Sequence, residues 1–218
     1  VFSGLAVPLA VALALVLALI LNTKLPGESA FRSIFLNPMM VPVASIVLIW
    51  QVLFSYNGTM NTYLMPLGVE QIDWMKSDWA RIVIMLLFLW KTIGYNMVLF
   101  LAALNNVPSE LIDTSKIDGA GSARRFFNIS LVYLYPTIFF VGIMSLINSF
   151  KIFREIYLLT GDYPYDVLYM LQHFMNNAFR NLDYQRLASA SIIMALVMIG
   201  IVGVLFLAEF KLGKGVEE

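Results

Sequence analysis

The segment from Val107 to Pro136 reads V-P-S-E-L-I-D-T-S-K-I-D-G-A-G-S-A-R-R-F-F-N-I-S-L-V-Y-L-Y-P. It is a polar segment between two apolar runs, each long enough to cross a bilayer. Pro108 predicts a helix start, and an acidic side chain follows in the first turn, where the positive end of the helix dipole favours it. Asp118-Gly119 is a turn signal, because glycine tolerates positive φ. We therefore predict two short helices joined by a turn, the second of which runs into the next apolar run.

The composition is that of a membrane protein. Hydrophobic residues make up 60% of the chain and charged residues 13%, whereas a soluble domain has about 45–50% and about 25%. Acidic and basic residues are equal in number, and no basic cluster is present, which excludes nucleic acid as a partner. These 218 residues contain no cysteine, so they offer no disulfide, no thiol nucleophile and no sulfur ligand for a metal.

Five apolar windows are long enough to span a bilayer, since roughly 20 helical residues cross about 30 Å of hydrocarbon. They are residues 4–21, 34–54, 82–104, 129–150 and 187–208. A span in lipid must satisfy its backbone hydrogen bonds internally, so these windows predict helices. No charged residue precedes the first window, which argues against a cleaved signal peptide there. We predict an all-α integral membrane protein in which residues 1–218 form a single transmembrane domain.

The polar segment resembles the cytoplasmic coupling loop (EAA loop) of binding-protein-dependent ABC importer permeases. The resemblance is to the carbohydrate-uptake branch, which includes the maltose and lactose permeases. That loop typically has Glu-Ala-Ala, two further residues and Asp-Gly-Ala, and a proline opens the next span. Asp-Gly-Ala at 118–120 and Pro136 match this pattern, whereas Asp-Thr-Ser stands in the Glu-Ala-Ala position at 113–115.

The resemblance extends over nearly the whole chain. It includes F-R-S-I-F-L-N-P at 31–38, N-G-T-M-N at 57–61, F-R-E-I-Y-L-L-T-G at 153–161 and A-F-R-N-L-D-Y at 178–184. One departure is Gly-Asp-Tyr-Pro at 161–164, where the family commonly has Gly-Gly-Pro after Thr-Gly. The resemblance implies a type I importer permease fold. Because such permeases usually carry one more span upstream, we expect a further span before Val1.

The resemblance, rather than the charge distribution, sets the orientation, because basic residues are divided almost evenly between the two sides. With the 107–128 loop in the cytoplasm, the connection 151–186 faces outside. Apolar residues recur there at helical spacing, which predicts an amphipathic helix on the outer membrane face: Leu168, Leu171, Met175 and Phe179. His173 lies in this helix, and we predict a surface or interfacial position for it rather than a metal or catalytic role.

In the family the loop is gripped by a cytoplasmic ATPase subunit, and its displacement rocks the spans. The resemblance therefore implies contacts with the ATPase for Asp113, Thr114, Ser115, Lys116, Asp118, Gly119, Ala120, Arg124 and Phe126. Gly119 would permit the bend between the two short helices. The alternative is an ordered connection between spans that binds nothing.

Polar and aromatic side chains share helical faces inside two of the spans. Ser145, Asn148, Ser149 and Ile152 recur at i, i+3, i+4 and i+7, and Thr92 and Tyr95 lie on another face beside Trp90 and Lys91. The resemblance implies that these stretches line a substrate pocket midway through the membrane. A sugar requires such a mixture, because hydroxyl and amide groups hydrogen-bond to it and aromatic rings stack on it. Alternatively, the Ser and Asn side chains only hold helices together, at about 0.6–2 kcal/mol each.

Lys91 is the one charged residue clearly inside a predicted span. A central lysine costs roughly 2.5–3.5 kcal/mol on insertion scales unless it is paired or hydrated. It could bind an acidic sugar, meet water in a cavity, or extend towards the membrane surface. No Asp or Glu falls inside a predicted span, which counts against the main alternative function, an ion-coupled secondary transporter.

The chain contains no phosphate-binding loop, nucleophile elbow or metal-binding pattern, so we predict no enzymatic activity, no catalytic residue, no metal and no cofactor. We predict the permease subunit of an ATP-driven importer of a sugar or oligosaccharide. The implied partners are a second permease subunit in a heterodimer, two cytoplasmic ATP-binding subunits, and an extracellular or periplasmic solute-binding protein. The implied location is the cytoplasmic membrane of a bacterium or archaeon, crossed several times.

Overall fold

The computed structural model describes residues 2–23 and 27–213, and all regular structure within these ranges is helical. The expectation of an all-α protein is therefore confirmed. The helices are α1 Phe2–Leu21, α2 Glu28–Met40, α3 Val43–Phe54, α4 Thr59–Leu64, α5 Ala80–Asn105, α6 Ser109–Ile117, α7 Ser122–Arg125, α8 Leu131–Lys151, α9 Phe153–Thr160, α10 Leu171–Arg180 and α11 Tyr184–Gly213. Short turns of other helix types are η1 Met65–Leu67, the π-helical η2 Phe126–Ser130 and η3 Asp166–Leu168. Residues 1, 24–26 and 214–218 of the predicted domain lie outside the described residues.

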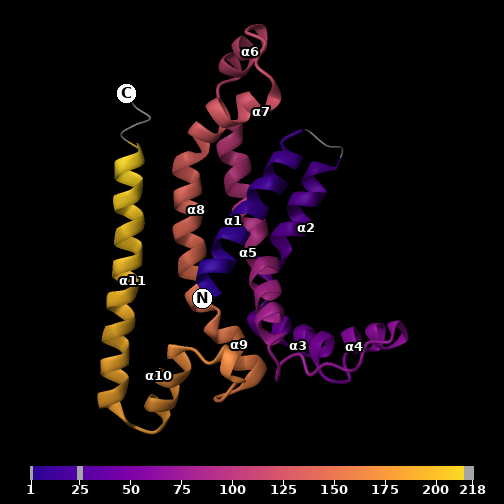
Figure 1. The fold of residues 1–218 in the computed structure, drawn as a ribbon, viewed down its shortest axis with the longest axis vertical. Helices are drawn as coiled ribbons and strands as arrows, with labels where there is room; N and C mark the ends of the chain where they lie inside the picture. Colours follow the sequence, from indigo (N-terminus) through magenta and orange to yellow (C-terminus); the bar gives the residue numbers. More distant parts are fainter. Residues whose placement is uncertain (1, 24–26, 214–218) are drawn as a thin grey trace.

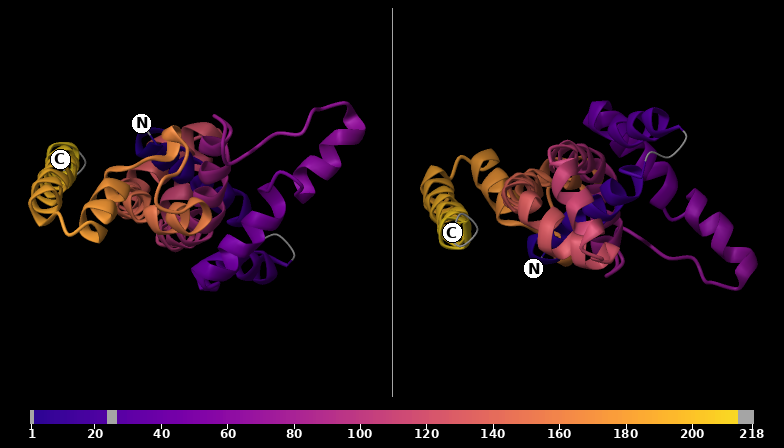
Figure 2. Two further views of the ribbon diagram at one scale, coloured as in Figure 1. Left: turned by 90° about the horizontal axis from the view of Figure 1, so that it is seen from below. Right: turned by 90° about the horizontal axis from the view of Figure 1, so that it is seen from above.

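Five helical stretches of the described chain are long and apolar enough to cross a membrane: Phe2–Leu21, Val43–Leu67, Ala80–Asn105, Ser122–Thr160 and Tyr184–Glu209. The number agrees with the sequence expectation. Helices α5, α8 and α11 run along the long axis of the molecule, with α6 and α7 at one end and α9 and α10 at the other (Figure 1). Helix α11 and the arm formed by α3 and α4 lie on opposite sides of the central helices (Figure 2).

The predicted window 34–54 is not one helix. Helix α2 ends at Met40, and both Val41 (φ −74°, ψ 131°) and Pro42 (φ −56°, ψ 138°) are extended. Proline lacks the N–H that a helix needs and disfavours a helical residue before it, so Pro42 interrupts the helix here. Pro38 is accommodated within α2. The span-capable stretch in this region is therefore Val43–Leu67, which combines α3 with the short helices that follow it.

Helix α5 is the centre of the bundle and contacts α1, α2 and α8. The contact face of α1 is an alanine stripe with four-residue spacing, and all of its members are fully buried: Ala6, Ala10, Ala14 and Ala18. Side chains four residues apart share one helical face. Small residues at this spacing let two backbones approach closely, which is the principal way that helices associate in lipid.

A second close approach joins α2 to α5 at Gly94. A Cβ atom built on Gly94 would overlap the backbone carbonyl group of Phe35. Only glycine fits this position without a shift of α2. The crossing brings Met39, near the end of α2, to the wall of the pocket described below.

The segment between α3 and α5 is organised around the buried side chain of Asn61. Its Nδ2 donates to the carbonyl oxygens of Tyr56 (2.7 Å) and Ile72 (2.8 Å), and its Oδ1 accepts from the Ile72 N–H (3.2 Å) and from Trp74 Nε1 (3.0 Å). One amide side chain thus ties both ends of this segment together. Sequence patterns gave no sign of this role, because the partners are mainly backbone groups.

His173 is fully buried, so the expected surface or interfacial position is wrong. Its ring packs edge-on against Phe153 (centroids 4.8 Å apart) and stacks on Tyr169 (5.6 Å), and its Nδ1 accepts a hydrogen bond from the Met170 N–H (3.2 Å). Burial lowers the pKa of His173, because desolvation penalises the charged imidazolium. The ring therefore joins α9 to α10 in the neutral form.

The close approach at Gly94 makes a direct prediction. Gly94→Ala should destabilise the protein by about 1–3 kcal/mol, the usual cost of overpacking, because the added methyl group displaces α2. Gly142→Ala is the matched control: it lies in α8, and its added Cβ would meet nothing within 4 Å. Thermal unfolding of the purified protein in detergent measures both. Equal melting temperatures for the two variants would contradict the proposed close packing.

Candidate functional site

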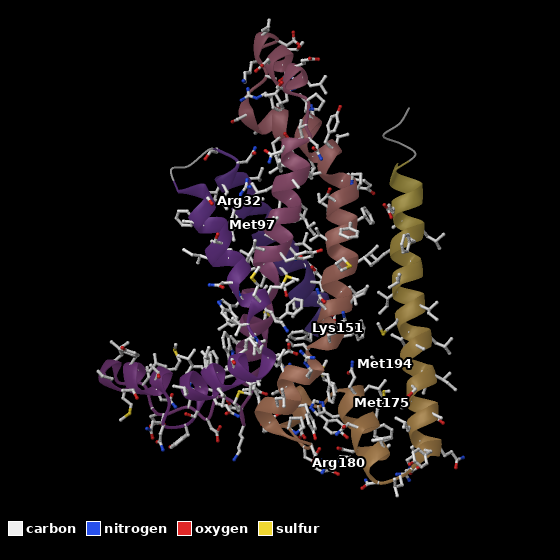
Figure 3. All side chains as sticks on the ribbon, turned by 180° about the vertical axis from the view of Figure 1, so that it is seen from behind. Arg32, Met97, Lys151, Met175, Arg180 and Met194 are labelled. Carbon is white, nitrogen blue, oxygen red and sulfur yellow. The ribbon has the colours of Figure 1, made fainter. Side chains whose placement is uncertain are left out.

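A pocket of about 610 Å³ opens between the middle of α5, the end of α8 and the start of α9. Its walls are Met39, Phe88, Lys91, Thr92, Tyr95, Met144, Asn148, Lys151, Ile152, Arg154 and Glu155. In Figure 3 the label of Lys151, the last residue of α8, marks the position of the pocket. A cavity of this volume is in the range of small-molecule sites.

The structure divides the predicted pathway residues into two groups. Lys91, Thr92, Tyr95, Asn148 and Ile152 line the pocket. Trp90, Ser145 and Ser149 do not. The first group comes from two helices and the junction after the second, so the predicted faces of α5 and α8 do meet.

The three residues outside the pocket make contacts between helices. The Trp90 ring lies 5.2 Å from that of Trp50 in α3. Ser145 Oγ accepts a hydrogen bond from Asn96 Nδ2 (2.8 Å), and Ser149 Oγ lies 2.8 Å from Ser3 Oγ. Both serines are fully buried, so the alternative reading, in which they hold helices together, describes these two positions.

Two polar groups in the wall are available to a ligand. Within the described part of the chain, no hydrogen bond engages the Tyr95 hydroxyl or the Asn148 amide. Thr92 Oγ1 donates to the Phe88 carbonyl (2.7 Å) and keeps acceptor capacity. The half-buried ring of Tyr95 supplies apolar surface. The pocket can therefore hydrogen-bond and pack against a polyhydroxylated ligand.

Lys91 is paired with Glu155, and this pair is the main electrostatic feature of the pocket. Lys91 Nζ donates to Glu155 Oε1, although the residues are 64 positions apart in the sequence. The Glu155 side chain is 3% exposed and that of Lys91 is 29% exposed, so the pair lies at the boundary between protein interior and pocket. Glu155 Oε2 is buried and has no hydrogen-bond partner among the described residues.

The pair explains how a lysine is accommodated inside a span, since an acidic partner compensates an intramembrane charge. It also corrects the statement that no acidic residue lies in a span, because Glu155 belongs to the span-capable stretch Ser122–Thr160. Glu155 was missed because the apolar window ends at 150. A usable signal was present: a lysine inside a span requires a partner, and Glu155 is the first acidic residue after the polar face of α8.

At the opposite end of α5 lies the loop that carries the predicted coupling residues (Figure 1). Helix α6 ends in a Schellman motif: the Ala120 N–H bonds to the Ser115 carbonyl (2.9 Å) and the Gly119 N–H to the Lys116 carbonyl (3.0 Å). Gly119 has φ +76°, which glycine adopts without the strain imposed on other residues. The turn between the two helices is therefore fixed by backbone bonds.

The other predicted loop residues surround this turn. Lys116 pairs with Asp113 (2.7 Å), and the Ala120 carbonyl accepts from Arg125 Nη1 (2.6 Å). Thr114, Asp118 and Arg124 are exposed, and Phe126 is half-buried against the end of the core. Three large apolar side chains, which we call the loop apolar patch, are exposed: Leu111 (42%), Ile117 (87%) and Phe127 (62%). Exposed apolar side chains rimmed by polar residues favour a protein-binding surface where they gather in one patch.

Comparison with known proteins gives a consistent result. The family described as "binding-protein-dependent transport system inner membrane component" matches residues 6–216. The sn-glycerol-3-phosphate transport system permease protein UgpA of Yersinia pestis is 32% identical over 209 residues, covering 94% of this chain and 71% of UgpA. The lactose transport system permease protein LacF of Rhizobium radiobacter is 32% identical over 139 residues, covering 62% of this chain and 47% of LacF.

A solved structure shares the fold. The crystal structure of a bacterial ABC transporter involved in the import of the acidic polysaccharide alginate matches with a TM-score of 0.82 and 20% sequence identity. The match covers 96% of this chain and 76% of the compared chain. The likeness confirms the expected importer-permease fold.

The ion pair in the pocket predicts a strong coupling energy. Lys91→Met leaves a buried carboxylate without its cation, and removal of one partner from a buried pair costs up to about 3–5 kcal/mol. Lys91→Met combined with Glu155→Gln should restore most of the lost stability, because both charges are then gone. Thermal unfolding of the single and double variants measures this as a double-mutant cycle.

The exposed pair of Lys116 and Asp113 supplies the control for that cycle. Lys116→Met should change stability by about 1 kcal/mol or less, as is usual for surface pairs. Strictly additive effects of Lys91→Met and Glu155→Gln would contradict the pairing.

Proposed function

We infer the function from the premise that this chain belongs to the family of binding-protein-dependent transport system inner membrane components. It is a multi-pass membrane protein and an ABC importer permease subunit rather than an enzyme. Family membership also favours ATP-driven import over an ion-coupled carrier. The absence of acidic residues from the predicted spans no longer argues against such a carrier, because Glu155 is buried within a span-capable stretch. The preference for ATP-driven import therefore rests on family membership alone.

The proposed substrate is a sugar or oligosaccharide, and its site is the pocket between α5, α8 and α9. Hydroxyl, amide and aromatic groups in the wall are the groups that bind sugars. The names of LacF and of the compared structure refer to lactose and alginate, both carbohydrates, and that of UgpA to a polyol phosphate. The pathway is proposed to form half of a cavity shared with a second permease in a heterodimer.

The loop of α6 and α7 is proposed to bind a cytoplasmic ATP-binding subunit, with two such subunits per transporter. The loop apolar patch supports this, because its side chains are exposed on the helical segments that flank the turn, and backbone bonds hold that turn in place. An external solute-binding protein would deliver cargo at the opposite end, near α9 and α10. The membrane would be the cytoplasmic membrane of a bacterium or archaeon.

The observation that carries this proposal is the continuity of α5. Lys91, Thr92 and Tyr95 line the pocket from the middle of this helix, and the same helix ends at Asn105, where the loop begins. A displacement of the loop by the ATPase would therefore move one wall of the pocket directly. Coupling through a rigid element is the simplest physical route between two such sites.

The proposed coupling is tested at the turn. Gly119→Val places a β-branched residue at φ +76°, a strain of about 1–2 kcal/mol that corresponds to a roughly 5- to 30-fold shift between loop conformations. ATP-driven uptake by the reconstituted transporter should fall accordingly, while insertion of the subunit in the membrane is unchanged.

Gly121→Val is the matched control, because Gly121 lies two residues away with φ −64° and open space around it. Uptake and ATP hydrolysis should remain near normal in this variant. Equal uptake by the two variants would refute the role assigned to the turn.

A further inference from the structure

The charges in the pocket wall do not balance. Lys91, Lys151 and Arg154 are basic, and Glu155 is the single acidic residue in the wall. The charge of Glu155 already compensates that of Lys91, because one of its oxygens accepts the hydrogen bond of Lys91 and its side chain is buried. Two cations therefore remain without a counter-charge.

Lys151 and Arg154 have no ion-pair partner within the described part of the chain. Both are exposed. They lie three residues apart across the junction of α8 and α9, so they belong to the same wall. Arg154 is in the first turn of α9, where the helix dipole disfavours a cation, so the local helix does not account for its charge.

The buried pair has a definite consequence for selectivity. An unpaired Lys91 could have received an anionic ligand, but its ammonium group is held by Glu155, whose charge compensates its own. Together, Lys91 and Glu155 add no net charge to the pocket that they line with Thr92 and Asn148. The uncompensated positive charge of the wall belongs to Lys151 and Arg154, at the junction of α8 and α9.

We propose that the pocket selects a sugar carrying a carboxylate or phosphate group and that Lys151 and Arg154 receive this anionic group, while Lys91 stays paired with Glu155. This deepens the function proposed above and rests on it. Charge-assisted hydrogen bonds from arginine and lysine are strong, and a guanidinium can contact both oxygens of one carboxylate or phosphate. The hydroxyl, amide and aromatic groups of the wall would then contact the sugar ring.

The test uses the complete transporter, with its partner subunits, in lipid nanodiscs. Three probes are compared in equilibrium binding: digalacturonate, which carries carboxylates, glucose 6-phosphate, which carries a phosphate, and galactobiose, which is neutral. At least one anionic probe should bind more tightly than galactobiose. The anionic probe that binds identifies which of the two groups the pocket accepts.

The double variant Lys151→Gln with Arg154→Gln should weaken binding of that anionic probe roughly 10- to 100-fold, through the loss of charge-assisted hydrogen bonds. Binding of galactobiose should not change. The control Lys76→Gln removes an exposed cation outside the pocket wall and should leave all three affinities unaltered.

Tighter binding of galactobiose than of both anionic probes would overturn the inference, as would an equal loss of neutral and anionic binding in the double variant. ATP-driven uptake of galactobiose alone would overturn the inference and leave the proposed sugar import intact. A complex that hydrolyses ATP but neither binds nor imports any of the probes would overturn both the inference about the anionic group and the proposed sugar import.

Discussion

The close approach of α1 and α2 to α5 is the constraint on which the rest of the structure depends. Lipid chains are as apolar as leucine, so helices in a bilayer are held together mainly by packing rather than by exclusion from water. The fully buried alanine stripe of α1 and the absence of a side chain at Gly94 bring two backbones close to α5. With α5 fixed from two sides, its remaining polar face meets α8 and α9 and forms one wall of the pocket.

A second constraint follows from placing a charge inside this bundle. The lysine in the middle of α5 is compatible with the membrane because a buried carboxylate from α9 receives its hydrogen bond. That contact ties the centre of the bundle to the helices at the end opposite α6 and α7, where His173 in turn joins α9 to α10. The chain of contacts extends from the loop of α6 and α7, along α5, to the end of the molecule formed by α9 and α10. In the proposed function, the continuity of these contacts is the physical basis for coupling an ATP-binding subunit at the loop to the pocket.

Much of this arrangement could be predicted from the sequence, where the signal is local. The five span-capable helices follow from apolar runs, and the two short helices with their turn follow from Pro108 and Gly119. The pocket positions on α5 and α8 follow from helical spacing together with the family resemblance. Pro42 also signalled the end of a helix, but the prediction assumed that a membrane helix would continue through this proline.

The rest depends on contacts between distant residues, which periodicity cannot show. The pairing of Lys91 with Glu155, the burial of His173 and the hydrogen bonds of Asn61 each need the folded chain to bring the partners together. Ser145 and Ser149 show the same limit, because spacing alone does not say whether a polar face meets a cavity or another helix.

The central claim is that the loop at one end of α5 is the contact point for a separate ATP-hydrolysing subunit. These 218 residues contain no cysteine, so a single cysteine introduced here and labelled with a photo-crosslinker is the one labelled position within them. Ile117→Cys lies in the loop and Tyr163→Cys at the opposite end, and both side chains are strongly exposed, at 87% and 75%. The account predicts that the crosslinker at position 117 joins the chain to the ATP-binding subunit and that the crosslinker at position 163 does not. Crosslinking to that subunit from position 163, and none from position 117, would contradict it.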